Sequence, residues 1–70
     1  MKVVINNIMK IKIYTHAYSN YIIAISKDQR FIDTYGKFYN INYNRRYAEL
    51  NEIKNWAEKN YNETVKFEFV

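Results

Sequence analysis

The chain has 70 residues, a formal net charge of +4, 19% aromatic residues and no cysteine. A chain of this length forms one small domain, residues 1–70, that buries only about 60% of the surface its unfolded form exposes. The lack of cysteine excludes a disulfide framework and a zinc–thiolate site, so aromatic rings must supply much of the core. No stretch approaches the roughly 18 apolar residues of a membrane span or the roughly 7 to 15 of a signal-peptide core. We therefore expect a protein of the cytoplasm, or of the host cytoplasm if the gene is viral.

The positive charge is unevenly distributed along the sequence. Residues 1–46 carry eight lysines and arginines against two aspartates, whereas residues 47–70 carry three lysines against five glutamates. A basic first region favours an anionic partner, either nucleic acid or an acidic protein surface, through long-range attraction. The alternative interpretation is that these charges only solvate the surface of a protein rich in lysine and asparagine.

The first predicted strand spans residues 10–15, in which isoleucine alternates with lysine and tyrosine. This period of two is typical of a strand with one buried face. Residues 1–8 either extend this strand or form a hairpin arm, because Asn6 and Asn7 tolerate the left-handed backbone of a tight turn.

The second and third predicted strands follow as a hairpin. Residues 21–26 are almost continuously apolar, which indicates a central strand buried on both faces. A compact turn at residues 27–29 leads into a third strand at residues 30–39, which lies at the edge of the sheet. Gly36, the only glycine of the chain, indicates a bulge or bend within that strand.

The period changes to that of a helix between residues 45 and 59. Its apolar stripe consists of Tyr47, Leu50, Ile53, Ala57 and Tyr61. Asn42 or Asn44 is expected to cap the start of the helix, and Asn60 or Asn62 to take the left-handed position at its end.

A fourth predicted strand at residues 65–69 completes the fold. The first three strands form an antiparallel meander, and a right-handed crossover through the helix places the fourth strand parallel to the first. The predicted fold is therefore α+β, a four-stranded mixed sheet of order 3-2-1-4 with the element order β-β-β-α-β and one helix on one face. The other face is left solvated or free for binding. The predicted core between helix and sheet consists of Ile13, Ile23, Ile25, Leu50, Ile53, Ala57, Phe67 and Phe69.

Two short stretches agree with a known pattern. Residues 13–17 read Ile-Tyr-Thr-His-Ala, and residues 44–50 read Asn-Arg-Arg-Tyr-Ala-Glu-Leu. They correspond in position to a strand ending in Thr-Asp-Gly and to the helix start Asn-Asn-Arg-x-Glu-Leu of the ribonuclease H-like superfamily. The chain resembles the core of that superfamily over residues 9–70, as a truncated and catalytically degenerate form.

The resemblance implies a fold without the family's chemistry. Such enzymes hold two Mg²⁺ ions in a cluster of carboxylates and cleave phosphodiester bonds. Here His16 stands at the first aspartate position, and imidazole is a poor ligand for a hard cation. Only Glu49 carries over, and the family's next aspartate lies just beyond the fourth strand, where this sequence reaches Val70. We therefore expect no enzyme activity, no metal and no cofactor, with His16 as a loop residue and Glu49 as a solvated first-turn residue that favours the helix dipole.

Binding residues are expected in residues 35–46, where tyrosine, asparagine, lysine and arginine concentrate. Tyrosine gives a large contact area at low entropic cost, and basic residues interleaved with aromatic rings can stack single-stranded bases and contact phosphates. About half of these rings are expected in the core. The predicted binding residues are Lys37, Tyr39, Tyr43, Arg45 and Arg46.

Two functions fit this sequence. The first is a small non-catalytic binding protein, encoded by a phage or mobile element, that inhibits a host defence nuclease such as a CRISPR effector by binding the protein or its nucleoprotein complex. The small size and the AT-rich codons implied by abundant Asn, Ile, Lys and Tyr favour that origin. The second is an RNA- or DNA-binding module of a degenerate ribonuclease H-like type. Neither function involves a membrane, and the oligomeric state is left open.

Overall fold

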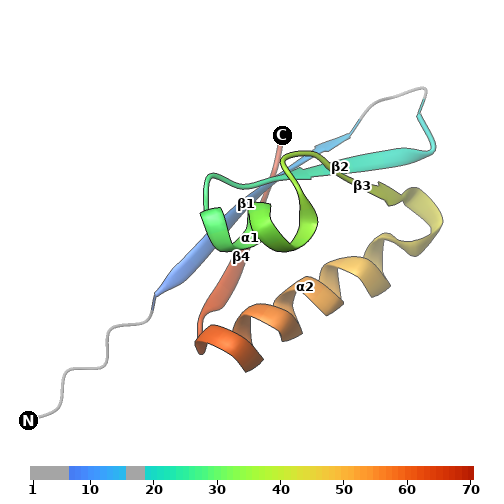
Figure 1. The fold of residues 1–70 in the computed structure, drawn as a ribbon. Coiled ribbons are helices and arrows are strands. Elements are labelled where there is room, and N and C mark those ends of the chain that lie inside the picture. The colour runs from blue at the N-terminus through green and yellow to red at the C-terminus, as the bar shows by residue number, and fades with distance from the viewer. Residues whose placement is uncertain (1–6, 16–18) are drawn as a thin grey trace, which may run out of the picture.

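A computed structural model describes residues 7–15 and 19–70 of the protein (Figure 1). Its elements are β1 (Ile8–Thr15), β2 (Tyr21–Ile25), α1 (Gln29–Tyr35), β3 (Tyr39–Asn42), the 3₁₀ turn η1 (Tyr43–Arg45), α2 (Arg46–Tyr61) and β4 (Thr64–Phe69). The strands form one sheet of order β3-β2-β1-β4, which confirms the predicted α+β fold and its strand order. Apart from Asn7 and Ile8, the predicted N-terminal extension or arm at residues 1–8 lies outside the described residues.

Strand β1 is the centre of the sheet. It pairs antiparallel with β2, where Ile13 faces Ala24, and parallel with β4, where Ile11 faces Phe67. Strand β3 completes the sheet by pairing antiparallel with β2. The parallel pairing of the first and last strands is the one that the predicted helical crossover requires. Within residues 7–15 and 19–70, neither helix is long and apolar enough to cross a membrane.

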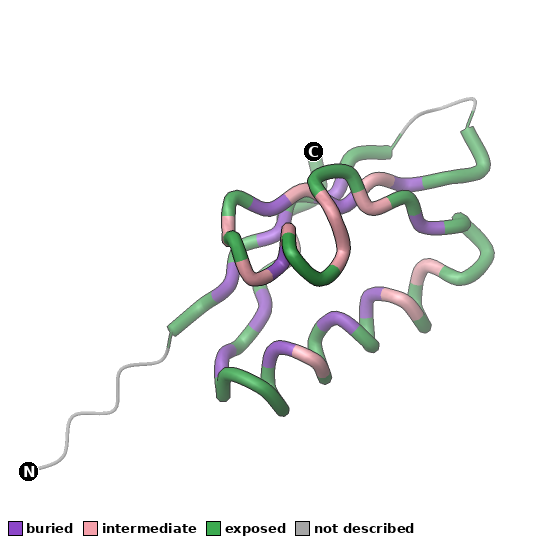
Figure 2. Tube along the Cα trace, viewed as in Figure 1, coloured by how far each residue is buried: buried purple, intermediate pink, exposed green. Residues whose placement is uncertain are grey.

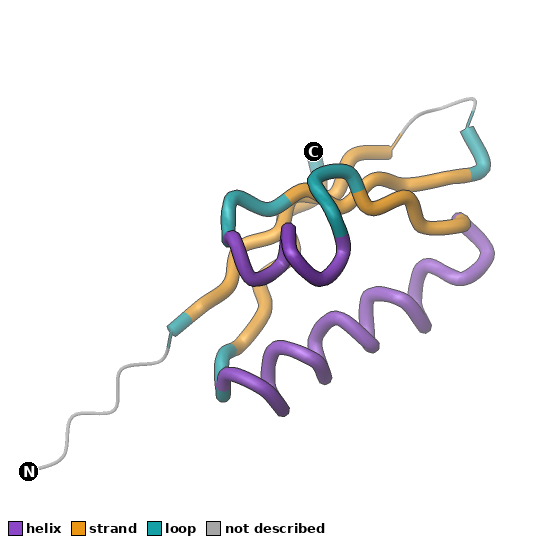
Figure 3. The backbone as a smooth tube through the Cα atoms, viewed as in Figure 1, coloured by secondary structure: helices purple, strands orange, loops and turns teal. Residues whose placement is uncertain are grey.

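The prediction of a strand at residues 30–39 is wrong, because most of this segment forms α1. The Asp28 carboxylate accepts a hydrogen bond of 2.9 Å from the backbone N–H of Arg30, which caps the start of the helix. Gly36 ends the helix with a φ of 94°, and its N–H donates to the Ile32 carbonyl at 2.8 Å. The residues interpreted as a hairpin turn and a bulge are therefore the two ends of a helix, and β3 begins only at Tyr39 (Figure 3).

Both helices pack on one face of the sheet. The buried side chains are Met9, Ile11, Ile13, Ile22, Ala24, Phe31, Ile41, Leu50, Ile53, Ala57 and Val65. The strand residues among them share one face of the sheet by the pairing register, and the remaining members come from α1 and α2. Figure 2 marks the buried positions along the chain. Phe31 of α1 contacts Trp56 of α2 edge to face, with ring centroids 6.3 Å apart, so the two helices share one core.

Four of the eight predicted core residues are buried and four are not. Ile13, Leu50, Ile53 and Ala57 are buried as predicted. Ile23 and Ile25 are only half-buried, because β2 is covered on one face and its buried positions are Ile22 and Ala24. Phe67 is half-buried and Phe69 is 65% exposed, since burial along β4 decreases toward its end.

Helix α2 begins and ends within two residues of its predicted bounds. Asn62 takes the left-handed conformation at its end, with a φ of 53°, as one of the two predicted alternatives. The Asn42 side chain caps η1 rather than α2 by accepting from the Asn44 N–H at 2.9 Å. Two residues of the predicted apolar stripe are not core residues, because Tyr47 is 76% exposed and Tyr61 is 39% exposed.

We expect Phe31→Ala to lower the free energy of unfolding by about 3 to 5 kcal/mol, because the ring is fully buried between the sheet and α2. The matched control is Phe38→Ala, which removes a ring that is 67% exposed and should change stability by no more than about 0.5 kcal/mol. Urea denaturation followed by circular dichroism measures both variants. Equal losses of stability in the two would contradict the position of α1.

Candidate binding surfaces

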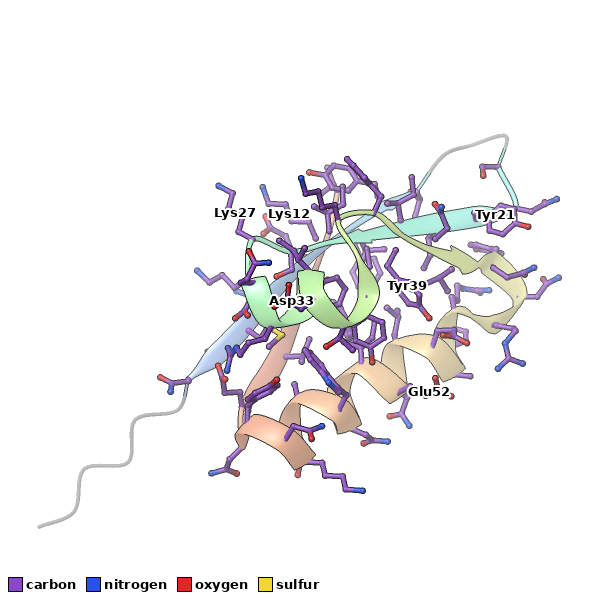
Figure 4. All side chains as sticks on the ribbon, viewed as in Figure 1. Lys12, Tyr21, Lys27, Asp33, Tyr39 and Glu52 are labelled. Atoms are coloured by element: carbon purple, nitrogen blue, oxygen red, sulfur yellow. The ribbon has the colours of Figure 1, made fainter. Side chains whose placement is uncertain are left out.

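The predicted binding residues are brought together only in part. Tyr43, Arg45 and Arg46 meet where η1 runs into α2. Lys37 is exposed in the loop between α1 and β3, at the opposite end of β3. Tyr39 is half-buried and points toward α2 (Figure 4). The continuous basic aromatic segment of the sequence is therefore divided by β3 into a loop and a helix start.

A compact cluster forms at the start of α2. We call Tyr43, Arg45, Arg46 and Tyr47 the helix-start cluster. The Arg46 guanidinium carbon lies 3.8 Å from the centroid of the Tyr43 ring and 4.5 Å from that of Tyr47. Its Nη1 also donates a hydrogen bond of 2.7 Å to the Tyr43 carbonyl. Two rings and a hydrogen bond thus fix the orientation of this cation at the surface.

The positive charges of the helix-start cluster do not stabilise α2. The N-terminal end of a helix carries a partial positive charge, so Arg45 and Arg46 stand at the end that disfavours cations. Arg45 occupies the cap position of α2 without a side-chain capping bond, and its Nε lies 3.5 Å from Oε1 of Glu49. Its side chain is 64% exposed, so this ion pair contributes little. The surface therefore combines cationic groups with a helix end that also attracts anions.

Tyr47 is the residue of this cluster that the sequence did not indicate as a binding residue. Its position on the apolar stripe predicted burial, yet its ring is 76% exposed and stacks on Arg46. The signal that could have identified it is the spacing of Tyr43 and Tyr47, which lie on either side of two arginines.

Tyr39 and Glu49 connect the helix-start cluster to β3. The Tyr39 hydroxyl donates to Oε2 of Glu49 at 2.5 Å, and the Tyr39 ring lies 4.9 Å from that of Tyr35. Glu49 lies in the first turn of α2 as predicted, but its side chain is only 17% exposed, so the expectation of a solvated residue is wrong. Glu49 bridges β3 and the helix start by contacting both Tyr39 and Arg45.

The hydrogen bond to the Glu49 carboxylate, together with partial burial, raises the pKa of Tyr39 to about 12. A charged acceptor stabilises the protonated phenol, so removing the charge should bring this pKa back toward about 10. We expect Glu49→Gln to lower it in this direction, as measured by NMR of tyrosine labelled at the ζ-carbon, with Tyr39→Phe identifying the resonance. A Tyr39 titration near pH 10 in the parent protein would contradict the hydrogen bond.

A second ionic cluster joins distant parts of the chain. Arg30 donates to both carboxylate oxygens of Asp28, at 2.9 and 2.6 Å, and also binds Glu63 at the connection between α2 and β4. The Glu63 side chain is only 8% exposed, and the Arg30 guanidinium lies 4.4 Å from the centroid of the Tyr61 ring. Its charged groups satisfy one another, so this cluster ties α1 to the end of α2 rather than presenting a reactive group.

Arg30 lowers the pKa of Asp28 below its ordinary value through hydrogen bonds to the carboxylate. Since the folded pKa is then lower than the unfolded value of about 3.9, the ion pair contributes fully above this pH and is lost as the pH falls through the folded pKa. We expect the stability of Asp28→Asn to fall less steeply in acid than that of the parent, because asparagine keeps the helix cap without the charge. Arg30→Met should flatten the acid profile in the same way. Parallel acid profiles of parent and Asp28→Asn in urea denaturation would contradict this account.

Among residues 7–15 and 19–70, no element covers the sheet face opposite the helices, and we call it the open face. Its residues alternate with the buried ones along each strand, and they are Ile8, Lys10, Lys12, Tyr14, Tyr21, Ile23, Ile25, Asn40, Asn42, Thr64, Lys66 and Glu68. Lys12 and Lys27 extend away from α2 on this side of the sheet (Figure 4). The open face is the uncovered surface that the predicted fold leaves solvated or free for binding.

The residues proposed by the ribonuclease H-like resemblance are not assembled into a metal site in the described structure. His16 lies outside the described residues, and Glu49 is bound to Tyr39 and Arg45. Within residues 7–15 and 19–70, no three aspartate, glutamate or histidine side chains are placed to hold a metal ion. Comparison with protein families, with characterised proteins and with solved structures finds no match to this chain. The resemblance therefore stays a prediction.

Proposed function

We propose that the protein is a non-catalytic binding protein that docks on an acidic surface of a partner protein or nucleoprotein complex through the helix-start cluster. The observation that carries the proposal is the half-buried Arg46 at the surface, held between the exposed rings of Tyr43 and Tyr47. A guanidinium whose orientation is already fixed loses less conformational freedom on binding a carboxylate than a free side chain does.

The composition of the helix-start cluster supports a protein partner. Tyrosine and arginine are over-represented among the residues that dominate the binding energy of protein interfaces. The ring faces of Tyr43 and Tyr47 that point toward Arg46 are already occupied, so nucleic acid bases could stack only on their outer sides. The remaining guanidinium N–H groups suit carboxylates of an acidic protein surface.

The narrower proposal is that this binding inhibits a host defence nuclease, such as a CRISPR effector. Its support is the small size and basic charge of the chain and its abundance of Asn, Ile, Lys and Tyr, residues whose codons are rich in A and T. Such an inhibitor needs no catalytic group, since occupying the surface that an enzyme uses is sufficient. The alternative function, binding of RNA or DNA, is favoured by the open face of the sheet rather than by the helix-start cluster.

The experiment measures target cleavage by a panel of purified, guide-loaded CRISPR effectors with and without the protein. We expect stoichiometric inhibition of one member and weaker inhibition by Arg46→Ala and Tyr47→Ala, by about 30-fold or more, because removal of an anchor costs about 2 kcal/mol or more. The matched control is Lys54→Ala, which removes an exposed charge from α2 away from its start.

Two outcomes contradict the proposal. One is the absence of inhibition across the panel at large excess of the protein. The other is inhibition by Arg46→Ala as strong as that by the parent, with the variant shown to be folded by circular dichroism.

A further inference from the structure

The open face carries two adjoining hollows that meet at Tyr14. The first is lined by Tyr14, Thr15, Ser19, Tyr21, Ile23 and Asn40. The second is lined by Tyr14 together with a group that includes Lys10, Lys12 and Lys27. Tyr14 borders both hollows, which follow one another along β1 and β2, so the open face has an aromatic end and a basic end.

The basic end holds positive charge that the sheet does not neutralise. Lys10 of β1 faces Lys66 of β4 in the parallel register, and like charges at facing positions of neighbouring strands destabilise their pairing. Glu68 faces Lys12, which offsets only part of this charge. Within residues 7–15 and 19–70, the lysines at positions 10, 12, 27 and 66 form no salt bridge. An anionic ligand would relieve the repulsion between these lysines.

The aromatic end presents two rings that the core does not use. Tyr14 is 37% exposed and Tyr21 is 51% exposed, whereas the aromatic cluster on the helix side is made by other rings. Ile23 faces Tyr14 in the register and Asn40 on the other side, so an apolar side chain separates the ring from an amide. Exposed rings on a sheet can stack unpaired bases, and an amide can bond a base edge.

We propose that the open face binds single-stranded nucleic acid, with bases stacked on Tyr14 and Tyr21 and phosphates at Lys10, Lys12 and Lys66. This inference does not depend on a protein partner at the helix-start cluster. A double helix would keep its bases stacked and out of reach of the tyrosines. A second copy of the chain is disfavoured, because a two-fold interface on this face buries the same basic patch of both copies.

The test measures fluorescence polarisation of labelled, mixed-sequence DNA and RNA of roughly 12 nucleotides, single-stranded and duplex. We expect single strands to bind more tightly than duplexes, and Tyr14→Ala and Tyr21→Ala to weaken binding by about tenfold each. Tyr14→Phe keeps the stacking ring and should bind like the parent. Lys10→Ala and Lys12→Ala should each reduce the slope of log affinity against log salt by about 0.7, as expected for one phosphate contact.

The matched controls are Lys54→Ala and Lys59→Ala, which remove the same charge from exposed positions on α2 and should leave the salt slope unchanged. Melting temperatures establish that each variant is folded, and Tyr14→Phe together with the lysine variants tests the inference if Tyr14→Ala does not fold.

Several results would overturn the inference. These are no binding of any single strand at low salt, duplex binding as tight as single-strand binding, and a salt slope that the open-face lysines do not change. Loss of binding in Arg46→Ala but in neither tyrosine variant would place the nucleic acid at the helix-start cluster. Sedimentation that shows a dimer dissociated by Tyr21→Ala would assign the open face to a second copy of the chain.

Discussion

The constraint on which this structure depends is the packing of both helices on one face of a four-stranded sheet. Phe31 of α1 meets Trp56 of α2 above the buried isoleucines of the strands, and Arg30 binds Glu63 where α2 leads into β4. In the structure these contacts place α1 and α2 side by side over the same core. The described part of the chain has no further helix, and none of its elements covers the opposite face. A small domain of this kind can complete its core on one face of the sheet and leave the other face to solvent.

Hydrophobic periodicity predicted the long helix, and the right-handed crossover rule applied to the predicted strands and helix predicted the sheet order. The sequence pattern predicted the wrong structure at α1, because Asp28 and Gly36 each fit two local structures. An aspartate three residues before an apolar residue fits a turn as well as a helix cap, and a glycine fits a bulge as well as a helix end. Phe31 and Tyr35 are compatible with a strand at a spacing of two and with a helix at a spacing of four. The pattern of β2 could not distinguish burial on one face from burial on both, because Ile23 and Ile25 are as apolar as Ile22.

The candidate sites were predictable where neighbours in the sequence are neighbours in space. Tyr43, Arg45 and Arg46 lie close together because η1 and the first turn of α2 follow one another directly. Tyr39 was separated from them by the alternation of β3, which points its side chain toward α2. The link between Arg30 and Glu63 spans 33 residues, and no local pattern indicates it. The two surfaces also differ in chemistry, since the helix-start cluster offers a fixed guanidinium and the open face offers rings and ammonium groups.

The measurement that tests the one-sided packing most directly is paramagnetic relaxation of isoleucine methyl groups by a soluble, uncharged probe. Ile22 and Ile23 are adjacent in β2 and point to opposite faces of the sheet, so they report on burial within one strand. The packing described here predicts strong relaxation at Ile8, Ile23 and Ile25 and weak relaxation at the fully buried Ile11, Ile13 and Ile22. Equal protection of Ile22 and Ile23 would show that the face described as open is covered, and would contradict the account.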